Sequence, residues 1–471
     1  IVIGYLNIGI LFPAFLSAAQ IGLYSFLNST AHMLMTLTSL GTPATLIRFT
    51  PQFSSQASTY RWFLKWVGQR FLLGVLIINL FLLATKDWVL AHYYADTPLL
   101  HDYYLYLLPL TTFLALFIVL GAYVRSHLRI VVPNALEKVV LRLILAILAL
   151  GVATEYVSFE QLIAGFTVAH LFIILVLAIY AFRLAPLPKA SAAPPSEKPS
   201  TRPLTYFGLL NVLTALGSEL VRNIDILMLA AMSGLADTGI YNIAFFIGAV
   251  IDMPMRSVGM ISSPLIARAW KNQDLTEISK LYRKSALNLT LAGGLLFVLI
   301  YANLDNIFAI IPNGSIYAKG MEVVLIIGAA RVISMSMGNN SEIIANSPYY
   351  YFNLISLSGL AVLTIATNLW LIPILGISGA AISTAISLTL FNLSKFLFLL
   401  WRYRLQPFNY QNGLAVCSIL LVSGLIWILP YFGSTIVDLF LSTFIVGTTY
   451  IGLVFLFKLD QDFRDILPKR K

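Results

Sequence analysis

The sequence predicts an all-α membrane protein that crosses the bilayer about fourteen times. Three observations carry this prediction: the 471-residue chain is 59% hydrophobic, only 11% of it is charged, and its mean hydropathy is +0.86. A soluble protein of this length would lack the polar side chains needed to cover its surface. The apolar residues form long runs rather than an alternation of period two, which favours helices over barrel strands.

The composition also excludes several other classes of protein. Disorder requires low hydrophobicity and high charge, and a single cysteine, Cys417, excludes a disulfide scaffold. The chain has no phosphate-binding loop of the form G-x-x-x-x-G-K-[ST], and its five histidines form no pair at metal-ligand spacing. We therefore expect no cofactor and no metal. The predicted external loops reach only about fifteen residues, which favours movement of a substrate over enzymatic bond chemistry.

Apolar windows bounded by charges, proline and glycine place the spans in order along the chain. Each window approaches the roughly 20 residues that a helix needs to cross hydrocarbon. The chain begins at Ile1, inside an apolar stretch, so we expect further residues to precede it. The predicted spans are residues 1–17, 21–50, 66–86, 102–126, 136–153, 160–183, 204–232, 238–268, 286–304, 317–346, 352–373, 376–401, 412–431 and 435–458.

Basic residues test the number of spans independently. Lys and Arg collect on the cytoplasmic side, and the chain changes sides with every span. One set of loops holds only Lys86 and Lys319. The alternate loops hold Arg61, Lys65, Arg125, Arg129, Lys138, Arg183, Lys189, Lys198, Arg202, Arg268, Lys271, Lys280, Arg283, Lys284, Arg402, Arg404, Lys458, Arg464, Lys469, Arg470 and Lys471. Both termini are therefore predicted to be cytoplasmic. The net charge of +10 then reflects loops that face anionic lipid headgroups, and no nucleic-acid module is present.

A proline-rich segment divides the predicted spans into two sets. Residues 184–203, LAPLPKASAAPPSEKPSTRP, contain six prolines and no apolar run, which is typical of a semi-rigid linker on the cytoplasmic side. We expect an N-terminal lobe of six helices at 1–183 and a C-terminal lobe of six helices at 204–401, arranged around a central cavity. Residues 402–471 would add two helices and a basic cytoplasmic tail.

Weak self-similarity accompanies this division. IGLYSFLNS at 21–29 resembles TGIYNIAFF at 238–246. Each stretch opens a span that we expect to be broken by a late proline, Pro43 or Pro264, and closed by an arginine, Arg48 or Arg268. The pattern suggests two similarly oriented lobes, as in transporters built from parallel repeats.

The ionisable residues inside the predicted C-terminal lobe are the candidate site. Such groups need partners or a wet cavity, because inserting each costs roughly 2.5–3.5 kcal/mol. In the seventh and eighth predicted spans, intervals of three and four residues place each arginine beside an acid on its own helix. The set consists of Glu219, Arg222 and Asp225 in the seventh span, Asp252 and Arg256 in the eighth, and Arg331 in the tenth.

This set has two interpretations, which the sequence leaves open. Arg222, Arg256 and Arg331 can bind an anionic, phosphate-bearing substrate, since the guanidinium donates in a fork that matches phosphate. In that case Glu219, Asp225 and Asp252 would take up protons, free the arginines and couple transport to a gradient. The alternative is a self-neutralised network that only locks the helices together.

Four other charged residues carry weaker hypotheses. Arg48 and Arg125 end spans at the cytoplasmic side, where they either anchor the helices by snorkelling or guide an entering anionic substrate. Lys395, two turns from a cytoplasmic end, is expected to snorkel. Glu342 is expected either to pair with a loop arginine or to take part in gating.

Four segments of the chain have a familiar pattern. One is NLWLIPILGISGAAISTAIS at 368–387, with a Leu-Ile-Pro turn followed by Gly-x-x-Gly-Ala-Ala. The others are FPAFLSAAQIGLYSFLNSTAHMLMTLTSLGTPATLIRFTPQF at 12–53, LYRKSALNLTLAGG at 281–294 and GNNSEIIANSPYYYFN at 338–353. These segments resemble the polysaccharide flippases, the polysaccharide transport branch of the multidrug, oligosaccharidyl-lipid and polysaccharide exporter superfamily. The first segment is the most telling, because it resembles the junction between the family's eleventh and twelfth helices, and the resemblance covers nearly the whole chain.

The resemblance implies fourteen helices in two lobes around a central cavity. It also implies flipping of an undecaprenyl-diphosphate-linked oligosaccharide from the cytoplasmic to the outer leaflet of a bacterial inner membrane, where ion coupling is usual. The product would supply O-antigen, capsule or exopolysaccharide synthesis, with polysaccharide polymerase and glycosyltransferases as partners. Two rivals remain: a drug and toxin exporter of the same superfamily, and a non-transporting component of a polysaccharide assembly complex.

Overall fold

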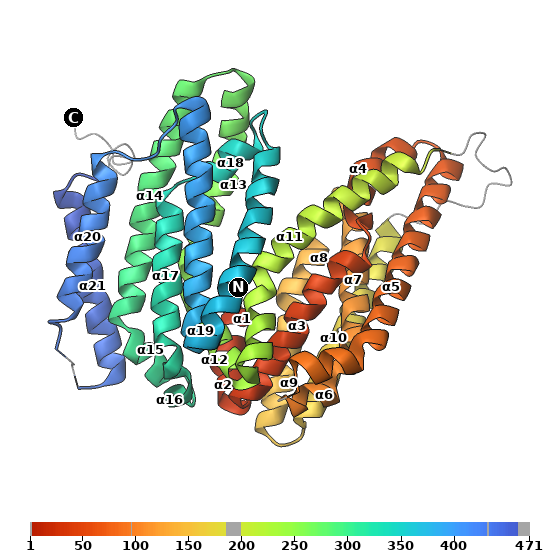
Figure 1. Cartoon of the computed structure of the whole chain (residues 1–471), viewed down its shortest axis with the longest axis horizontal. Coiled ribbons are helices and arrows are strands. Elements are labelled where there is room, and N and C mark those ends of the chain that lie inside the picture. The colour runs from red at the N-terminus through yellow and green to blue at the C-terminus, as the bar shows by residue number, and fades with distance from the viewer. Residues whose placement is uncertain (1, 96, 185–198, 431–432, 460–471) are drawn as a thin grey trace. The chain divides into compact units, whose positions relative to one another are not determined.

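The computed structural model describes residues 2–95, 97–184, 199–430 and 433–459. These residues form helices joined by short turns, with no strand among them (Figure 1). Most of the expected linker at 184–203 and the basic tail after residue 459 lie outside this part of the chain. The chain forms two compact units, Ile1–Gly239 and Ile240–Lys471. The lobe boundaries expected from the sequence, 1–183, 204–401 and 402–471, stay a prediction.

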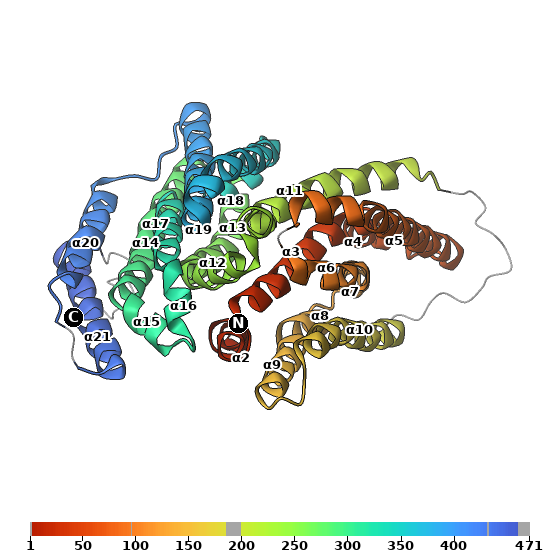
Figure 2. The same cartoon turned by 60° about the horizontal axis from the view of Figure 1, so that its bottom comes forward.

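The first unit packs around the helices that follow the N-terminus. Its elements are α1 (Val2–Leu6), η1 (Asn7–Leu11), α2 (Phe12–Phe15), α3 (Ala18–Thr38), α4 (Thr42–Phe53), α5 (Ala57–Tyr93), α6 (Pro98–Tyr103), η2 (Tyr104–Tyr106), α7 (Leu107–Ser126), α8 (Val131–Ala135), η3 (Leu136–Val140), α9 (Leu141–Ala153), α10 (Phe159–Leu184), α11 (Arg202–Met232) and the start of α12 (Gly234–Gly248). α7 packs against α3, α4 and α10, and α11 runs along α3 and α4 (Figure 2).

The second unit packs around α14 and α17. Its elements after α12 are η4 (Ala249–Asp252), α13 (Met253–Lys271), α14 (Leu275–Ala302), α15 (Leu304–Ile310), α16 (Gly314–Tyr317), η5 (Ala318–Gly320), α17 (Met321–Ser336), α18 (Asn340–Ala345), α19 (Tyr351–Tyr403), α20 (Tyr410–Ile426) and α21 (Thr435–Leu456). α17 packs against α14 and α19, and α18 packs against α13 and α19. α20 and α21 lie beside α14 (Figure 1).

The predicted spans agree with the helices in the described residues. Eight helical stretches are long and apolar enough to cross a membrane, and shorter apolar helices cover Ile3–Phe15 and Tyr410–Ile426. α19 contains two predicted spans, 352–373 and 376–401, because Gly376 adopts φ +56° and turns the chain back on itself. The rings of Phe352 and Phe398 stack at 4.1 Å across the resulting helical hairpin. The observed elements are thus compatible with about fourteen spans.

The exposed and buried faces have the polarity of a membrane protein. Leu72, Leu76 and Leu80 of α5 are 65%, 56% and 56% exposed, at intervals that place them on one helix face. By contrast, Thr42 and Thr45 are fully buried, and their hydroxyls donate to backbone carbonyls. Large apolar side chains outside and satisfied polar groups inside are stable only when hydrocarbon surrounds the protein. The protein is therefore a multi-pass membrane protein.

The self-similar stretches correspond in the structure to long segments that are each interrupted once. The first is interrupted between α3 and α4, just before Pro43, as expected. The break expected at Pro264 is wrong, because Pro264 lies inside α13. That segment is interrupted instead by the 3₁₀ turn η4, and Pro254 occupies the first turn of α13. A proline in the first turn sacrifices no intrahelical hydrogen bond, so it marks a helix start better than an internal proline does.

Two glycines at equivalent positions of the self-similar stretches pack against each other. A Cβ on Gly22 would overlap the backbone oxygen of Leu235, and a Cβ on Gly239 would overlap that of Ala18. The contact is reciprocal and leaves no room for a side chain on either helix. Small residues four positions apart allow such close approach of membrane helices.

A second close approach joins α4 to α11. Gly41, which precedes α4, adopts φ +73°, and a Cβ there would overlap the backbone of Gly208. Only glycine satisfies both demands, because a positive φ is strained for other residues and the space is already filled. The turn at Gly41 therefore determines how α11 lies on α4.

We expect Gly41→Ala to destabilise the protein by at least about 1 kcal/mol, from the strained φ alone, with a further loss from the clash with Gly208. Thermal unfolding of the purified protein in detergent measures the effect. Gly68→Ala in α5 is the matched control, because a Cβ there meets nothing within 4 Å and alanine is the better helix former. Equal stability of the two variants would contradict the close approach.

Candidate functional site

A cavity of about 430 Å³ in the second unit brings several predicted site residues together. Its volume lies within the roughly 300–1,000 Å³ of small-ligand pockets. Glu342 of α18 lines it, and Oε1 of Glu342 is 3.8 Å from the position that a Cβ on Gly259 would take. The remaining lining residues recur every three or four positions, which places them on one helix face. They are Asp252, Met255, Arg256, Gly259, Met260 and Ser263.

Asp252 is held by an arginine from another helix. Nη1 of Arg331, in α17, donates to Oδ2 of Asp252 at 2.6 Å, and both side chains are 18% exposed. The ring of Phe245 lies 5.7 Å from the Arg331 guanidinium carbon. The pair uses one hydrogen bond only: Oδ1 of Asp252 and Nε of Arg331 are buried and have no hydrogen-bond partner among the described residues. The closest cation to Asp252 is therefore Arg331 and not Arg256, four residues along its own helix.

Arg256 lines the cavity with its donors available. Its side chain is exposed, and it makes no ion pair or hydrogen bond within the part of the chain that the structure describes. Its guanidinium can therefore donate two parallel hydrogen bonds to an anion that enters the cavity. Of the three arginines predicted to bind substrate, Arg256 has the geometry best suited to it in this conformation.

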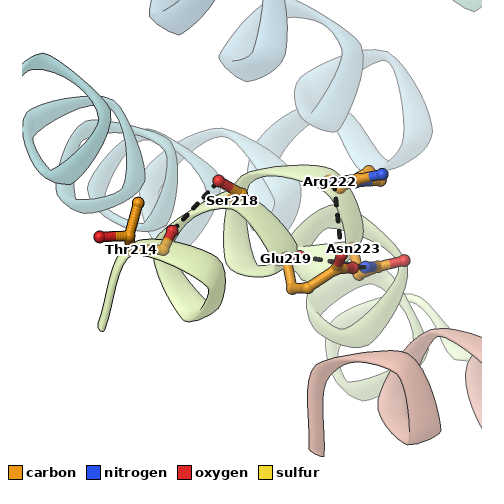
Figure 3. Close-up of polar contacts among 5 residues, drawn as sticks. All are labelled: Thr214, Ser218, Glu219, Arg222 and Asn223. Atoms are coloured by element: carbon orange, nitrogen blue, oxygen red, sulfur yellow. Dashed lines mark hydrogen bonds and ion pairs between the residues drawn. The ribbon is translucent and has the colours of Figure 1, made fainter. Parts of the chain in front are cut away.

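The predicted acids and arginine of the seventh span lie on α11, in the first unit. Arg222 Nη2 is 3.3 Å from Glu219 Oε1, and the Arg222 side chain is 67% exposed (Figure 3). Asn223 donates to Oε2 of the same carboxylate at 3.0 Å. Asp225 is buried at 6% exposure. The same-helix pairing expected for Arg222 is thus present, between an exposed guanidinium and a largely buried carboxylate.

Polar side chains continue along α11 toward its N-terminus. The hydroxyl of Ser218 donates to the backbone carbonyl of Thr214 (Figure 3). The hydroxyl of Thr214 donates in the same way to the carbonyl of Leu210. Such bonds satisfy the hydroxyls inside the helix itself, so α11 can expose them without a partner from another helix.

The two predicted entry residues are both exposed. Arg48 of α4 lies over the ring of Phe207, with its guanidinium carbon 4.4 Å from the ring centroid. Arg125 is in the last turn of α7. A cation–π contact at an exposed site contributes about 0.5–1 kcal/mol, which orients Arg48 without removing its charge.

Lys395 is buried, so the snorkelling expected from the sequence is wrong. It is 3% exposed, and Nζ donates to Oγ of Ser341 at 2.7 Å. It also lies 3.6 Å from the centroid of the Phe391 ring. Glu342 is the next residue after Ser341. A position two turns from a helix end allows snorkelling, but the packing of α18 on α19 covers Lys395 instead.

Buried amides tie the same helices together. Nδ2 of Asn392 donates to Ser334 in α17 at 2.9 Å, and Nδ2 of Asn340 donates to Oδ1 of Asn392 at 3.4 Å. Asn339 donates to Ser262 of α13. These bonds join α13, α17, α18 and α19, and they determine where Glu342 and Lys395 lie.

The formal charges around the cavity cancel. The lining residues Asp252 and Glu342 are acidic and Arg256 is basic, and Arg331, the partner of Asp252, is the second base. The sequence set of three acids and three arginines also predicted a balance, although it included neither Glu342 nor Lys395. The polar run GNNSE at 338–342 was the available signal for both.

The comparisons with known proteins agree with this architecture. The structure is similar to the lipid II flippase MurJ in an inward closed conformation, with TM-score 0.77 and 12% identity over 99% of this chain and 97% of that one. It is similar to an inward-facing multidrug resistance MATE family transporter of the MOP superfamily, with TM-score 0.68 and 15% identity over 85% and 94% of the two chains. At these identities the likeness shows the fold.

Sequence comparison identifies the family. A search of curated protein sequences gives no significant match. The sequence model of the family described as polysaccharide biosynthesis protein matches residues 3–270, more than half of the chain. The chain therefore belongs to the polysaccharide biosynthesis protein family.

Proposed function

We propose that this protein is a flippase that moves undecaprenyl-diphosphate-linked oligosaccharide from the cytoplasmic to the outer leaflet of the bacterial inner membrane. Transport proceeds by alternating access and is coupled to an ion gradient, and it supplies O-antigen, capsule or exopolysaccharide synthesis. A diphosphate cannot cross hydrocarbon unaided, because each buried charge costs several kcal/mol. Family membership and the flippase-like fold support this proposal.

The observation that carries the proposal is the available guanidinium of Arg256 in this cavity. Arginine is suited to a lipid diphosphate because its planar fork donates to two phosphate oxygens at once. Arg331 and Arg222 are the other proposed ligands of the diphosphate, and each becomes available when Asp252 or Glu219 releases it. The one-bond geometry of the Asp252–Arg331 pair favours such an exchange.

Protonation of the carboxylates Glu219, Asp225 and Asp252 is the proposed coupling step. A carboxylate that takes up a proton no longer holds its arginine, so proton binding and substrate binding are linked. Arg48 and Arg125 attract the entering diphosphate at the cytoplasmic side, and both termini are cytoplasmic. Polysaccharide polymerase, glycosyltransferases and anionic membrane lipids are the proposed partners.

A multidrug exporter is the second candidate, because one similar structure is a multidrug resistance transporter. A cationic drug requires a cavity of net negative charge, whereas the acids and arginines here balance, with Asp252 and Glu342 against Arg256 and Arg331. Transport of a cationic dye such as ethidium by vesicles that do not flip the glycolipid would favour the exporter.

Replacement of Arg256 tests substrate binding. We expect Arg256→Ala to slow flipping of a fluorescent diphosphate-linked glycolipid in vesicles by at least about ten-fold, because charge-assisted hydrogen bonds are lost. Arg256→Lys, which keeps the charge without the fork, should fall between Ala and wild type. Arg268→Ala, on an exposed position of the same helix, is the control. Normal flipping by Arg256→Ala would refute this role.

Replacement of the Asp252–Arg331 pair tests how much the pair contributes to the stability of the fold. Arg331→Met should destabilise the protein by about 3 kcal/mol, because it leaves Asp252 charged and partly buried without its partner. Asp252→Leu combined with Arg331→Met should recover most of that stability, since no lone charge remains. Thermal unfolding in detergent measures both. A double variant as unstable as the single one would show that the pair has another essential role.

Cysteine labelling tests the orientation. In the Cys417→Ala background, a cysteine at Gln273, between α13 and α14, should react with an impermeant thiol reagent only from the cytoplasmic side. A cysteine at Ser315, in α16, should react only from outside. Both positions are exposed. Reaction of both cysteines from the same side would exclude the proposed topology.

A further inference from the structure

Glu342 is an unexpected lining residue, because its carboxylate repels the phosphate that Arg256 is proposed to bind. Its carboxylate lines the cavity beside Gly259. Among the described residues the carboxylate accepts no hydrogen bond. A negative group beside a bare phosphate costs affinity, because like charges repel in a medium of low dielectric constant. Its presence therefore indicates a ligand that brings hydrogen-bond donors next to its phosphate.

The other lining residues fit the same kind of ligand. Ser263 lies seven residues after Arg256, about 10 Å along the helix, and its hydroxyl makes no hydrogen bond among the described residues. Glu342 is level with Gly259, between these two. Met255 and Met260 add apolar, adaptable surface. The cavity thus presents a cation, a carboxylate, a hydroxyl and apolar surface in sequence along one helix face.

Lys395 holds the segment that carries Glu342. It is buried, and its hydrogen bond to Ser341 fixes the residue that directly precedes Glu342. A carboxylate that keeps its charge accepts stronger hydrogen bonds than a neutral group does. Lys395 is therefore a positioning residue for Glu342 and does not touch the ligand.

We propose that this cavity binds the first sugar of the lipid-linked glycan together with the phosphate that carries it, with Arg256 on the phosphate and Glu342 and Ser263 on the sugar hydroxyls. This inference rests on the proposed flippase function and adds a determinant of sugar specificity to it. The Glu342 carboxylate and the phosphate of the ligand repel each other. Hydrogen bonds from sugar hydroxyls to the carboxylate compensate for this repulsion, so a ligand without hydroxyls is rejected.

The test measures the affinity of the purified full-length protein for undecaprenyl diphosphate, bare or carrying one sugar. Three sugars are used: N-acetylglucosamine, glucose and galactose. Wild type should prefer at least one glycosylated lipid to the bare diphosphate by about ten-fold. Glu342→Gln should remove that preference. It should weaken binding of the glycolipid, because an amide accepts weaker hydrogen bonds than a carboxylate, and strengthen binding of the bare diphosphate, because a like charge is lost. Glu277→Gln, in the exposed first turn of α14, is the matched control.

Gly259→Ala is a second variant that does not depend on the stability of Glu342 substitutions. The added methyl group meets only Glu342 Oε1, at 3.8 Å, and alanine favours the helix. It should narrow the sugar-binding part of the cavity and lower the preference for the glycosylated lipid. Lys395→Gln should lower the same preference, a readout that a purely structural role would not change in a protein that remains folded.

The outcomes separate this inference from the function on which it rests. If wild type binds no undecaprenyl diphosphate in any form, the flippase proposal fails. If it binds the bare lipid and all three glycolipids equally, or if Glu342→Gln changes every affinity by the same factor, the sugar site fails and the flippase proposal stands. Phosphatidylglycerol also joins a phosphate to hydroxyls, so displacement of the glycolipid by phosphatidylglycerol but not by phosphatidic acid would assign the site to a lipid headgroup and overturn the inference.

Discussion

A charge inside a membrane-spanning helix needs a partner or water, and this constraint shapes the second unit. Asp252 is held by Arg331 at 2.6 Å, and Lys395 donates to Ser341 beside Glu342. Arg256 satisfies the constraint differently, by reaching an open cavity. Because Asp252 already pairs with Arg331, the positive charge of Arg256 remains for a ligand. The chemistry of the cavity therefore follows from how its neighbours are paired.

The polar interior positions these charges. Asn392 donates to Ser334, Asn340 donates to Asn392, and Lys395 donates to Ser341, so α17, α18 and α19 are joined by hydrogen bonds as well as by packing. Buried amides of this kind favour one arrangement of helices, since a displaced helix would leave them unsatisfied. Glu342 follows directly after Ser341, so the same network determines where its carboxylate lies.

The two ion pairs differ in how exposed their arginine side chains are. On α11, Arg222 is mostly exposed and only loosely held by Glu219 at 3.3 Å, whereas Arg331 makes a short bond inside the second unit. The carboxylates of both pairs are largely buried, so the difference lies in the exposure of the arginine. In the proposed cycle, Arg222 can therefore reach a substrate directly, and Arg331 requires a change in Asp252 first.

The sequence by itself determined the membrane class, the spans and the family resemblance, because hydropathy and loop charge are properties of each segment. It also placed Asp252, Arg256 and Arg331 inside predicted spans. It did not determine that Asp252 pairs with Arg331, 79 residues away, that Lys395 is buried, or that Pro264 continues its helix. Which helix covers a side chain depends on close packing between segments distant in sequence, at sites such as Gly41 and Gly208. Only the tertiary structure decides those contacts, and with them which charge stays available to a ligand.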